Sequence, residues 1–135
     1  MRKNNALQRV SINSATPSGA LLKQFATNAL AGTVVLNEPG ISIVQLKDGS
    51  ILEFYGFGSF YAERIFDKGN MIVNFKVNDI QSSVKEFMND GAALLDGITR
   101  PCSTYAYCYL LLNNEMVIGI YQEDTGSDVE SAPDA

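Results

Sequence analysis

The chain has 135 residues, 46% of them hydrophobic and 19% charged, a composition typical of a single globular domain that buries its own core. Its formal net charge of −5 arises at the end of the chain: five of the 15 acidic residues and no basic residue follow Gln122, so the body before them carries ten charges of each sign. A neutral body lacks the clustered Lys and Arg that nucleic-acid binding requires, and no apolar run is long enough to cross a membrane.

Two cysteines, Cys102 and Cys108, and the absence of histidine bear on compartment and metal chemistry. A secreted protein of this size would be expected to carry more cysteines in disulfides, so we expect reduced thiols and a cytoplasmic location. The basic residues at positions 2–3 are followed by no apolar segment, so no signal peptide is predicted. Residues 123–135 are polar and acidic, and we expect a disordered tail there.

The first half predicts elements in the order β-α-β-β-β. A strand over residues 8–12 precedes Thr16 and Pro17, which suit the N-cap and first turn of a helix, and Gly32 is expected to end that helix in a left-handed conformation. Three short strands are predicted next, over residues 33–36, 41–46 and 51–57, with a hairpin turn at residues 47–50 joining the last two.

The second half predicts the same order. A strand over residues 71–77 is followed by Asp79 as N-cap and by a helix whose apolar positions recur at helical spacing and which ends before Gly91. Further strands are predicted at 93–98, 105–112 and 116–122, the last two joined at Asn113 and Asn114. The sequence therefore predicts an α+β fold of two βαβββ modules, residues about 8–57 and 70–122, within one domain spanning residues 1–122. A further extended segment at 60–66, between the modules, is left open.

Three segments of the second half carry a family resemblance: Val73-Asn-Phe-Lys-Val-Asn-Asp-Ile80, the helix end Met88-Asn-Asp-Gly91, and the closing Ile118-Gly-Ile-Tyr-Gln122. They resemble the second half of the vicinal oxygen chelate superfamily, which includes glyoxalase I, extradiol dioxygenases and bleomycin-resistance proteins. Residues 8–57 resemble its first half more faintly, through Asp48-Gly-Ser-Ile-Leu-Glu-Phe54. The resemblance implies a concave mixed β-sheet with both helices on the outside, and a homodimer in which the cups are completed across subunits.

The resemblance also implies where a metal would bind, since the metal enzymes of the superfamily take one ligand from each of four strands. Those places fall near Arg9, at Glu53, at Ile72 and at Gly119, and a shift of one residue would replace Arg9 by Gln8. Even with Gln8 there are only two oxygen donors, whereas a transition metal needs three or four converging ligands. We therefore expect no bound metal or other cofactor, and glyoxalase or dioxygenase chemistry that depends on a metal is disfavoured.

Strand alternation predicts which side chains share the cup. The predicted ligand-binding residues are Arg9, Glu53, Tyr55, Ile72, Asn74, Lys76, Cys108, Gly119 and Tyr121. Glu53 is expected to pair with Arg9 or Lys76, and it is the candidate catalytic group if the protein is an enzyme.

The position of Cys108 depends on the length of the turn at Asn113 and Asn114. A two-residue turn pairs Cys108 with Gly119 and places its thiol in the cup, while Tyr105, Tyr107 and Tyr109 turn outward to packing or a subunit contact. A turn longer by one residue reverses these faces, so the side on which the tyrosines lie is left open.

These observations favour a small-molecule-binding protein of bleomycin-resistance or glyoxalase-like type, non-catalytic and independent of metal. One alternative is an isomerase or lyase that uses Glu53 as general base without a metal, and another is a structural or accessory dimer whose cup is filled by side chains. Residues 56–60 with Glu63 and Arg64 also resemble bacterial HU-type DNA-binding proteins, but no basic arm follows them. The predicted dimer surfaces are residues 54–66 and the tyrosine face of residues 105–109.

Overall fold

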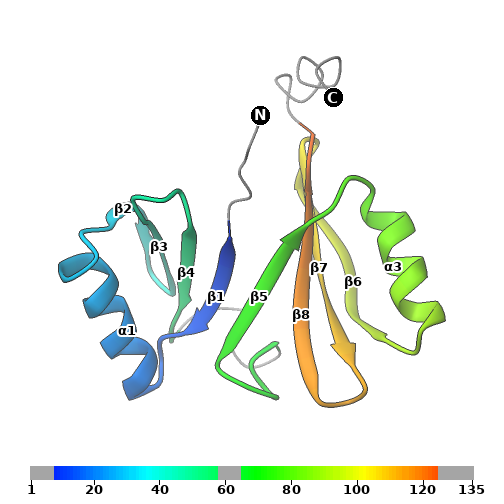
Figure 1. The fold of residues 1–135 in the computed structure, drawn as a ribbon, viewed down its shortest axis with the longest axis horizontal. Coiled ribbons are helices and arrows are strands. Elements are labelled where there is room, and N and C mark those ends of the chain that lie inside the picture. Colours follow the sequence, from blue (N-terminus) through cyan, green and yellow to red (C-terminus); the bar gives the residue numbers. More distant parts are fainter. Residues whose placement is uncertain (1–7, 58–64, 125–135) are drawn as a thin grey trace. The chain divides into compact units, whose positions relative to one another are not determined.

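The computed structural model describes residues 8–57 and 65–124, and the chain divides into two compact units, Met1–Asn74 and Phe75–Ala135. The described residues form two helices and eight strands, paired both parallel and antiparallel, in the order β-α-β-β-β twice (Figure 1). The predicted α+β fold and its module order are confirmed. No helix among the described residues is long and apolar enough to span a membrane.

In unit 1, helix α1 (Pro17–Asn28) begins at the predicted position. Thr16 is its N-cap, and the Thr16 Oγ1 atom accepts a hydrogen bond from the Gly19 N–H at 3.0 Å. The prediction for its end is wrong, because the residue with a left-handed backbone is Ala31, at φ 54°, and not Gly32. Gly32 is needed for a different reason: a Cβ atom there would lie 2.5 Å from the Cγ1 atom of Val44, so the chain after the helix could not pack this closely on the sheet.

The strands of unit 1 follow the order β2-β3-β4-β1-β5. Their bounds are β1 Arg9–Asn13, β2 Thr33–Glu38, β3 Ile41–Gln45, β4 Ile51–Tyr55 and β5 Met71–Lys76, the last of which continues into unit 2. Strand β1 is central, because it pairs parallel with β4 and antiparallel with β5. This register places Ser11 beside Glu53 on one side and Ile72 on the other.

One face of the unit 1 sheet packs against α1. The buried residues of this core are Ile12, Ala26, Val44 and Phe54. Because neighbouring side chains along a strand point to opposite faces, Ser11 and Glu53 lie on the face away from α1.

Unit 2 contains helix α3 (Ile80–Asn89) and strands β6 (Ala93–Cys102), β7 (Tyr105–Leu112) and β8 (Met116–Glu123), in the order β8-β7-β6. Asp79 caps the helix as predicted, since its Oδ1 atom accepts from the N–H groups of Gln81 and Ser82 at 3.1 and 3.2 Å. The bond from the Ser82 N–H lowers the pKa of the Asp79 carboxyl.

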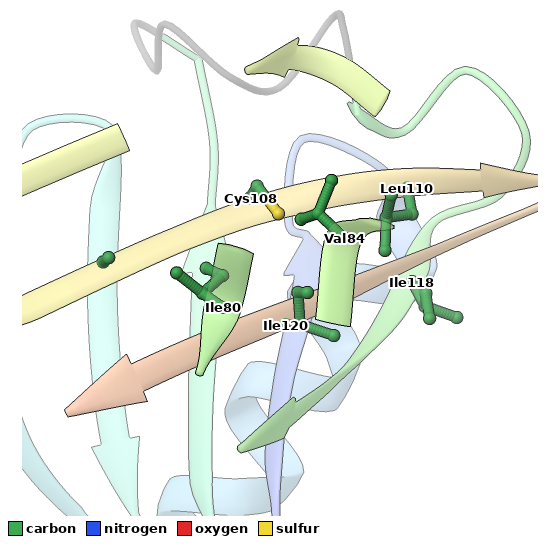
Figure 2. Close-up of a cluster of buried hydrophobic side chains, with 7 residues drawn as sticks. Ile80, Val84, Cys108, Leu110, Ile118 and Ile120 are labelled. Carbon is green, nitrogen blue, oxygen red and sulfur yellow. The ribbon is translucent and has the colours of Figure 1, made fainter. Parts of the chain in front are cut away.

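The core of unit 2 lies between α3 and the sheet, where side chains of the helix meet those of β7 and β8 (Figure 2). Its buried residues are Ile80, Val84, Ala106, Cys108, Leu110, Ile118 and Ile120. Each unit therefore buries its helix on one sheet face and leaves the other face for different side chains.

Two features of unit 2 differ from the sequence-based expectation. Strand β6 extends to Cys102 instead of ending near Ile98, because an irregularity at Asp96 and Gly97, both at positive φ, allows pairing with β7 to resume at Thr99. In the β7–β8 hairpin Leu112 pairs with Met116, so three residues separate the paired positions where two were expected. That one residue changes which side chains face α3.

Candidate functional site

A buried carboxylate organises the face of the unit 1 sheet that is turned away from α1. Glu53 on β4 is only 6% exposed. Its Oε2 atom accepts a hydrogen bond from Arg9 Nε at 2.7 Å, and its Oε1 atom accepts from Ser11 Oγ at 2.9 Å and from Tyr55 OH at 3.3 Å. The charge is thus compensated by a cation and two hydroxyl groups, as a buried ionised side chain requires.

Asn74 on β5 extends this network across β1. Its Nδ2 group donates to Ser11 Oγ at 3.0 Å and to the Arg9 carbonyl oxygen at 3.2 Å. Ser11 therefore accepts from Asn74 while it donates to Glu53, and it joins the amide to the carboxylate. The Oδ1 atom of Asn74 receives no donor from the residues that the structure describes, although the residue is only 9% exposed.

Isoleucines from three strands surround the polar network. Ile72 pairs with Ser11, Ile51 with Arg9 and Ile43 with Glu53, so all three share the face of the carboxylate. Ile72 is buried and the other two are partly buried. Apolar neighbours lower the local dielectric constant and thereby strengthen each hydrogen bond in the network.

The structure brings five of the predicted site residues together in unit 1, and they are Arg9, Glu53, Tyr55, Ile72 and Asn74. Of the two predicted partners of Glu53, the pairing with Arg9 is the one observed. Lys76 instead lies 3.5 Å from Glu123 in an exposed ion pair. Whether these residues bind a ligand stays a prediction.

Ser11 was missed by the sequence analysis. The register places Ser11, not Arg9 or Gln8, directly between Glu53 and the Ile72 position of the implied metal site. The available signal was alternation: Ser11 is two residues from Arg9 on the same strand, and it is the polar residue between the apolar Val10 and Ile12.

The predicted position of Cys108 in the cup is wrong. Because of the longer hairpin loop, Cys108 pairs with Ile120, and its side chain packs in the core under α3. Burial raises the pKa of this thiol to about 11, which makes it inert as a nucleophile at neutral pH.

The tyrosines of β7 take the face that the prediction gave to Cys108. Tyr109 pairs with Gly119 and Tyr107 with Tyr121, so all four lie on the sheet face away from α3. The ring centroid of Tyr105 lies 5.8 Å from that of Tyr107 and 6.0 Å from that of Tyr121, within the range of favourable aromatic contacts. Since Tyr109 and Tyr121 are buried, this row is not the outward surface that the sequence analysis considered for a dimer contact.

The second predicted dimer surface, residues 54–66, is also not a continuous exposed surface among the described residues. Phe54 is buried in the core of unit 1, and Ile65 and Phe66 are buried as well. Phe57 is the exposed exception, and residues 58–64 lie outside the described residues.

The residues present do not fit a divalent metal at the position implied by the resemblance. Both oxygens of Glu53 already accept hydrogen bonds, one of them from the cationic Arg9, and Ile72 offers no donor. Gly119, the fourth position, has no side chain to coordinate a metal. Within residues 8–57 and 65–124 no group of three or more His, Cys, Asp or Glu side chains is arranged to hold a metal ion.

Comparisons with known proteins address the fold. No protein-family model matches the sequence, and the search of curated proteins found no match. Among solved structures, a glyoxalase/bleomycin resistance protein/dioxygenase superfamily member from Vibrio splendidus 12B01 matches with a TM-score of 0.56 and 14% identity, over 88% of this chain and 98% of that one.

Two further structures agree with this match. Methylmalonyl-CoA epimerase of Streptomyces coelicolor has a TM-score of 0.59 at 14% identity, covering 91% of this chain and 100% of that chain. A hypothetical protein from Bacillus halodurans C-125 has a TM-score of 0.62 at 17% identity, covering 91% and 97%. The matches to the superfamily member and to the epimerase show that the chain has the vicinal oxygen chelate fold, and identities this low show the fold alone.

Proposed function

We propose that this protein, a chain with the vicinal oxygen chelate fold, binds a small organic molecule at the Glu53 face of unit 1 without a metal and without catalysis. The observation that carries the proposal is the Oδ1 atom of Asn74, which lies in a nearly buried network and has no donor among the described residues. Buried polar atoms in native proteins almost always have a partner, so a ligand or an ordered water is needed to supply one.

The surrounding side chains indicate what kind of molecule would suit this face. Asn74 offers an acceptor, so the ligand would present an N–H or O–H group to it. Ile51 and Ile72 offer apolar contact on the same face, so the rest of the ligand would be at least partly apolar. A compact amphipathic molecule with a hydroxyl or amine group meets both conditions.

The geometry supports binding over the alternative in which Glu53 is a general base. A catalytic base must reach a substrate proton with a free lone pair in good geometry. In the structure Oε1 accepts from two hydroxyl groups and Oε2 from Arg9, so a substrate proton would be limited to the remaining lone pair of Oε2, beside the guanidinium group of Arg9. An isomerase or lyase mechanism through Glu53 is therefore the weaker candidate.

A thermal-shift series over a panel of small alcohols, amines and drug-like compounds tests the proposal. For any compound that stabilises the wild-type protein, Glu53→Gln and Asn74→Ala should each weaken binding by about 1–3 kcal/mol, the range for hydrogen bonds to buried or charged groups. Asn70→Ala is the matched control, because Asn70 forms an exposed hydrogen bond with Asn13 in the same unit. It should bind every compound as the wild type does.

The same series separates binding from a purely structural role. If Glu53→Gln and Asn74→Ala melt earlier but keep every ligand-induced shift, the network is only a clamp that holds β1, β4 and β5 together. That outcome would contradict the binding role and favour the alternative of an accessory protein whose cup is filled.

We further propose that the chain works as a cytoplasmic homodimer. The support for a dimer is apolar surface: Met71, Val73 and Phe75 alternate along β5 and are each about half exposed, and Val34 and Val35 are similarly exposed on the edge strand β2. The support for the compartment is the exposed free thiol of Cys102, which a reducing environment would preserve. Light scattering at micromolar concentration should give twice the chain mass of 14.7 kDa, and a particle of the single-chain mass would contradict the dimer.

A further inference from the structure

A polar pocket lies on the α1 side of the unit 1 sheet, the side opposite to Glu53. It has a volume of about 190 Å³, and the side chains that matter to the argument are Ser14, Lys23, Asn37, Glu38 and Ser42. They come from the β1–α1 connection, α1, the end of β2 and the start of β3. Ser42 pairs with Phe54, whose side chain packs toward α1, which places the pocket on the helix side.

Ser42 holds the two nitrogen groups of this pocket in position. It is only 5% exposed, and its Oγ atom accepts a hydrogen bond from Lys23 Nζ at 2.9 Å while donating to Asn37 Oδ1 at 2.9 Å. Because Asn37 uses its oxygen toward Ser42, its NH₂ group is directed elsewhere, and it has no acceptor among the described residues.

Lys23 brings a positive charge that no carboxylate in the described part of the chain neutralises. The ion pairs found there are Arg9–Glu53 and Lys76–Glu123, and the ammonium group of Lys23 bonds only to Ser42. An ammonium group carries three donors, so two remain available at the pocket. Glu38 lines the same pocket but forms no ion pair with Lys23.

We propose that this pocket binds a small oxyanion, either a phosphate or a carboxylate group. The ammonium of Lys23 supplies the charge, and the Asn37 amide and the Ser14 hydroxyl supply further donors around the same space. At roughly 30 Å³ per water the volume corresponds to about six waters, enough for an inorganic phosphate or a short carboxylate. Among the described residues that line the pocket, Glu38 carries the one opposing charge, and it limits the affinity.

This site shares no residue with the Glu53 network and lies on the other sheet face. The proposal of an anion site is therefore independent of the proposed function. Amide NMR spectra of the full chain, titrated with sodium phosphate and separately with sodium acetate, test it against sodium chloride at matched ionic strength. We expect saturable shifts centred on Lys23, Asn37 and Ser42 with phosphate or with acetate, and none with chloride. The anion that binds more tightly identifies the class of the natural ligand.

Variants make the test specific. Lys23→Gln should lower the affinity at least tenfold, Lys23→Arg should retain it within about threefold because the charge stays, and Glu38→Gln should raise it several-fold because the opposing charge is removed. Lys47→Gln is the control, since Lys47 is an exposed lysine of the same unit outside the pocket, and it should bind as the wild type does.

Three results would overturn the proposal: no anion-specific shifts in the wild type, shifts spread equally over Lys47 and Lys23, or undiminished binding by Lys23→Gln. If Lys23→Gln does not fold, as judged by its amide spectrum, the wild-type shift map and the response of Glu38→Gln decide the question by themselves.

Discussion

In both units the sheet face toward the helix carries an apolar core, whereas the opposite faces of the two sheets carry different kinds of side chain. In unit 1 Val44 and Phe54 pack beneath α1. In unit 2 Leu110 and Ile120 pack beneath α3 (Figure 2). On the opposite faces, unit 1 carries the ion-paired Glu53 network, whereas unit 2 carries a row of tyrosines.

This difference indicates which sheet face can carry polar functional side chains. A helix-facing core must be apolar and close-packed in both units, because any polar group there would need a partner. A buried ion pair is not required for stability and can often be replaced by apolar side chains without loss. Among the described residues such a pair lies in unit 1 and none is found on the tyrosine face of unit 2, which makes unit 1 the better candidate for a binding role.

The largest expected effect concerns the ion pair itself. Arg9→Met leaves Glu53 charged and nearly buried without its cation, and we expect it to lower the free energy of unfolding by about 2–4 kcal/mol in urea denaturation. Lys76→Met is the matched control in unit 2, where the side chains of Lys76 and Glu123 are 50% and 39% exposed, and it should cost about 0–1 kcal/mol.

A double variant sharpens this result. Arg9→Met combined with Glu53→Leu removes both charges and should recover much of the lost stability. If Arg9→Met costs no more than Lys76→Met, the Glu53 network does not differ energetically from an exposed pair, and the contrast between the two units disappears.

A smaller effect is expected from the two cysteines of unit 2. Burial raises the pKa of the Cys108 thiol in the folded state to about 11, above the ordinary value of 9.0. The protonated thiol therefore stabilises the folded state fully below pH 9, and this stabilisation is lost as the pH rises toward 11. We expect a loss of about 1–2 kcal/mol over that range, measured by urea denaturation, that is absent in Cys108→Ala.

Thiol labelling at pH 8 provides the control. Cys102 is exposed, and a hydrogen bond with Thr104 lowers its pKa, so it should react quickly in the folded protein. Cys108 should react only on unfolding. Fast labelling of both thiols would contradict the position of Cys108 under α3 and would return it to the opposite face.

The smallest effect concerns the helix caps, in which the two units are alike in geometry but not in charge. Thr16→Ala should destabilise the protein by about 1 kcal/mol at any pH, because its hydroxyl does not titrate. Asp79→Ala should also lower the melting temperature. The pKa of Asp79 is lowered below 3.8 in the folded state, so its stabilising effect is present above that pH and is lost as the pH falls further. Melting curves at neutral and acidic pH should show a pH-dependent difference from wild type for Asp79→Ala but not for Thr16→Ala.

Local sequence was sufficient to determine much of this fold. The N-caps Thr16 and Asp79 were predicted correctly because capping involves only a side chain and the next three residues. The module order was predictable because it depends on periodicity along single segments. The placing of Arg9, Glu53 and Asn74 on one face came from the family resemblance together with strand alternation.

Tertiary structure decided the features that depend on how separate segments meet. The choice of Ser11 as the neighbour of Glu53 follows from the register of three strands, which no single strand encodes. The position of Cys108 depended on one residue of loop length after Asn114. The left-handed conformation falls on Ala31, and Gly32 is instead required by its close approach to Val44. The register of the three strands and the approach of Gly32 to Val44 involve contacts distant in sequence, and the hairpin had two locally acceptable loop lengths, so the sequence alone did not resolve these features.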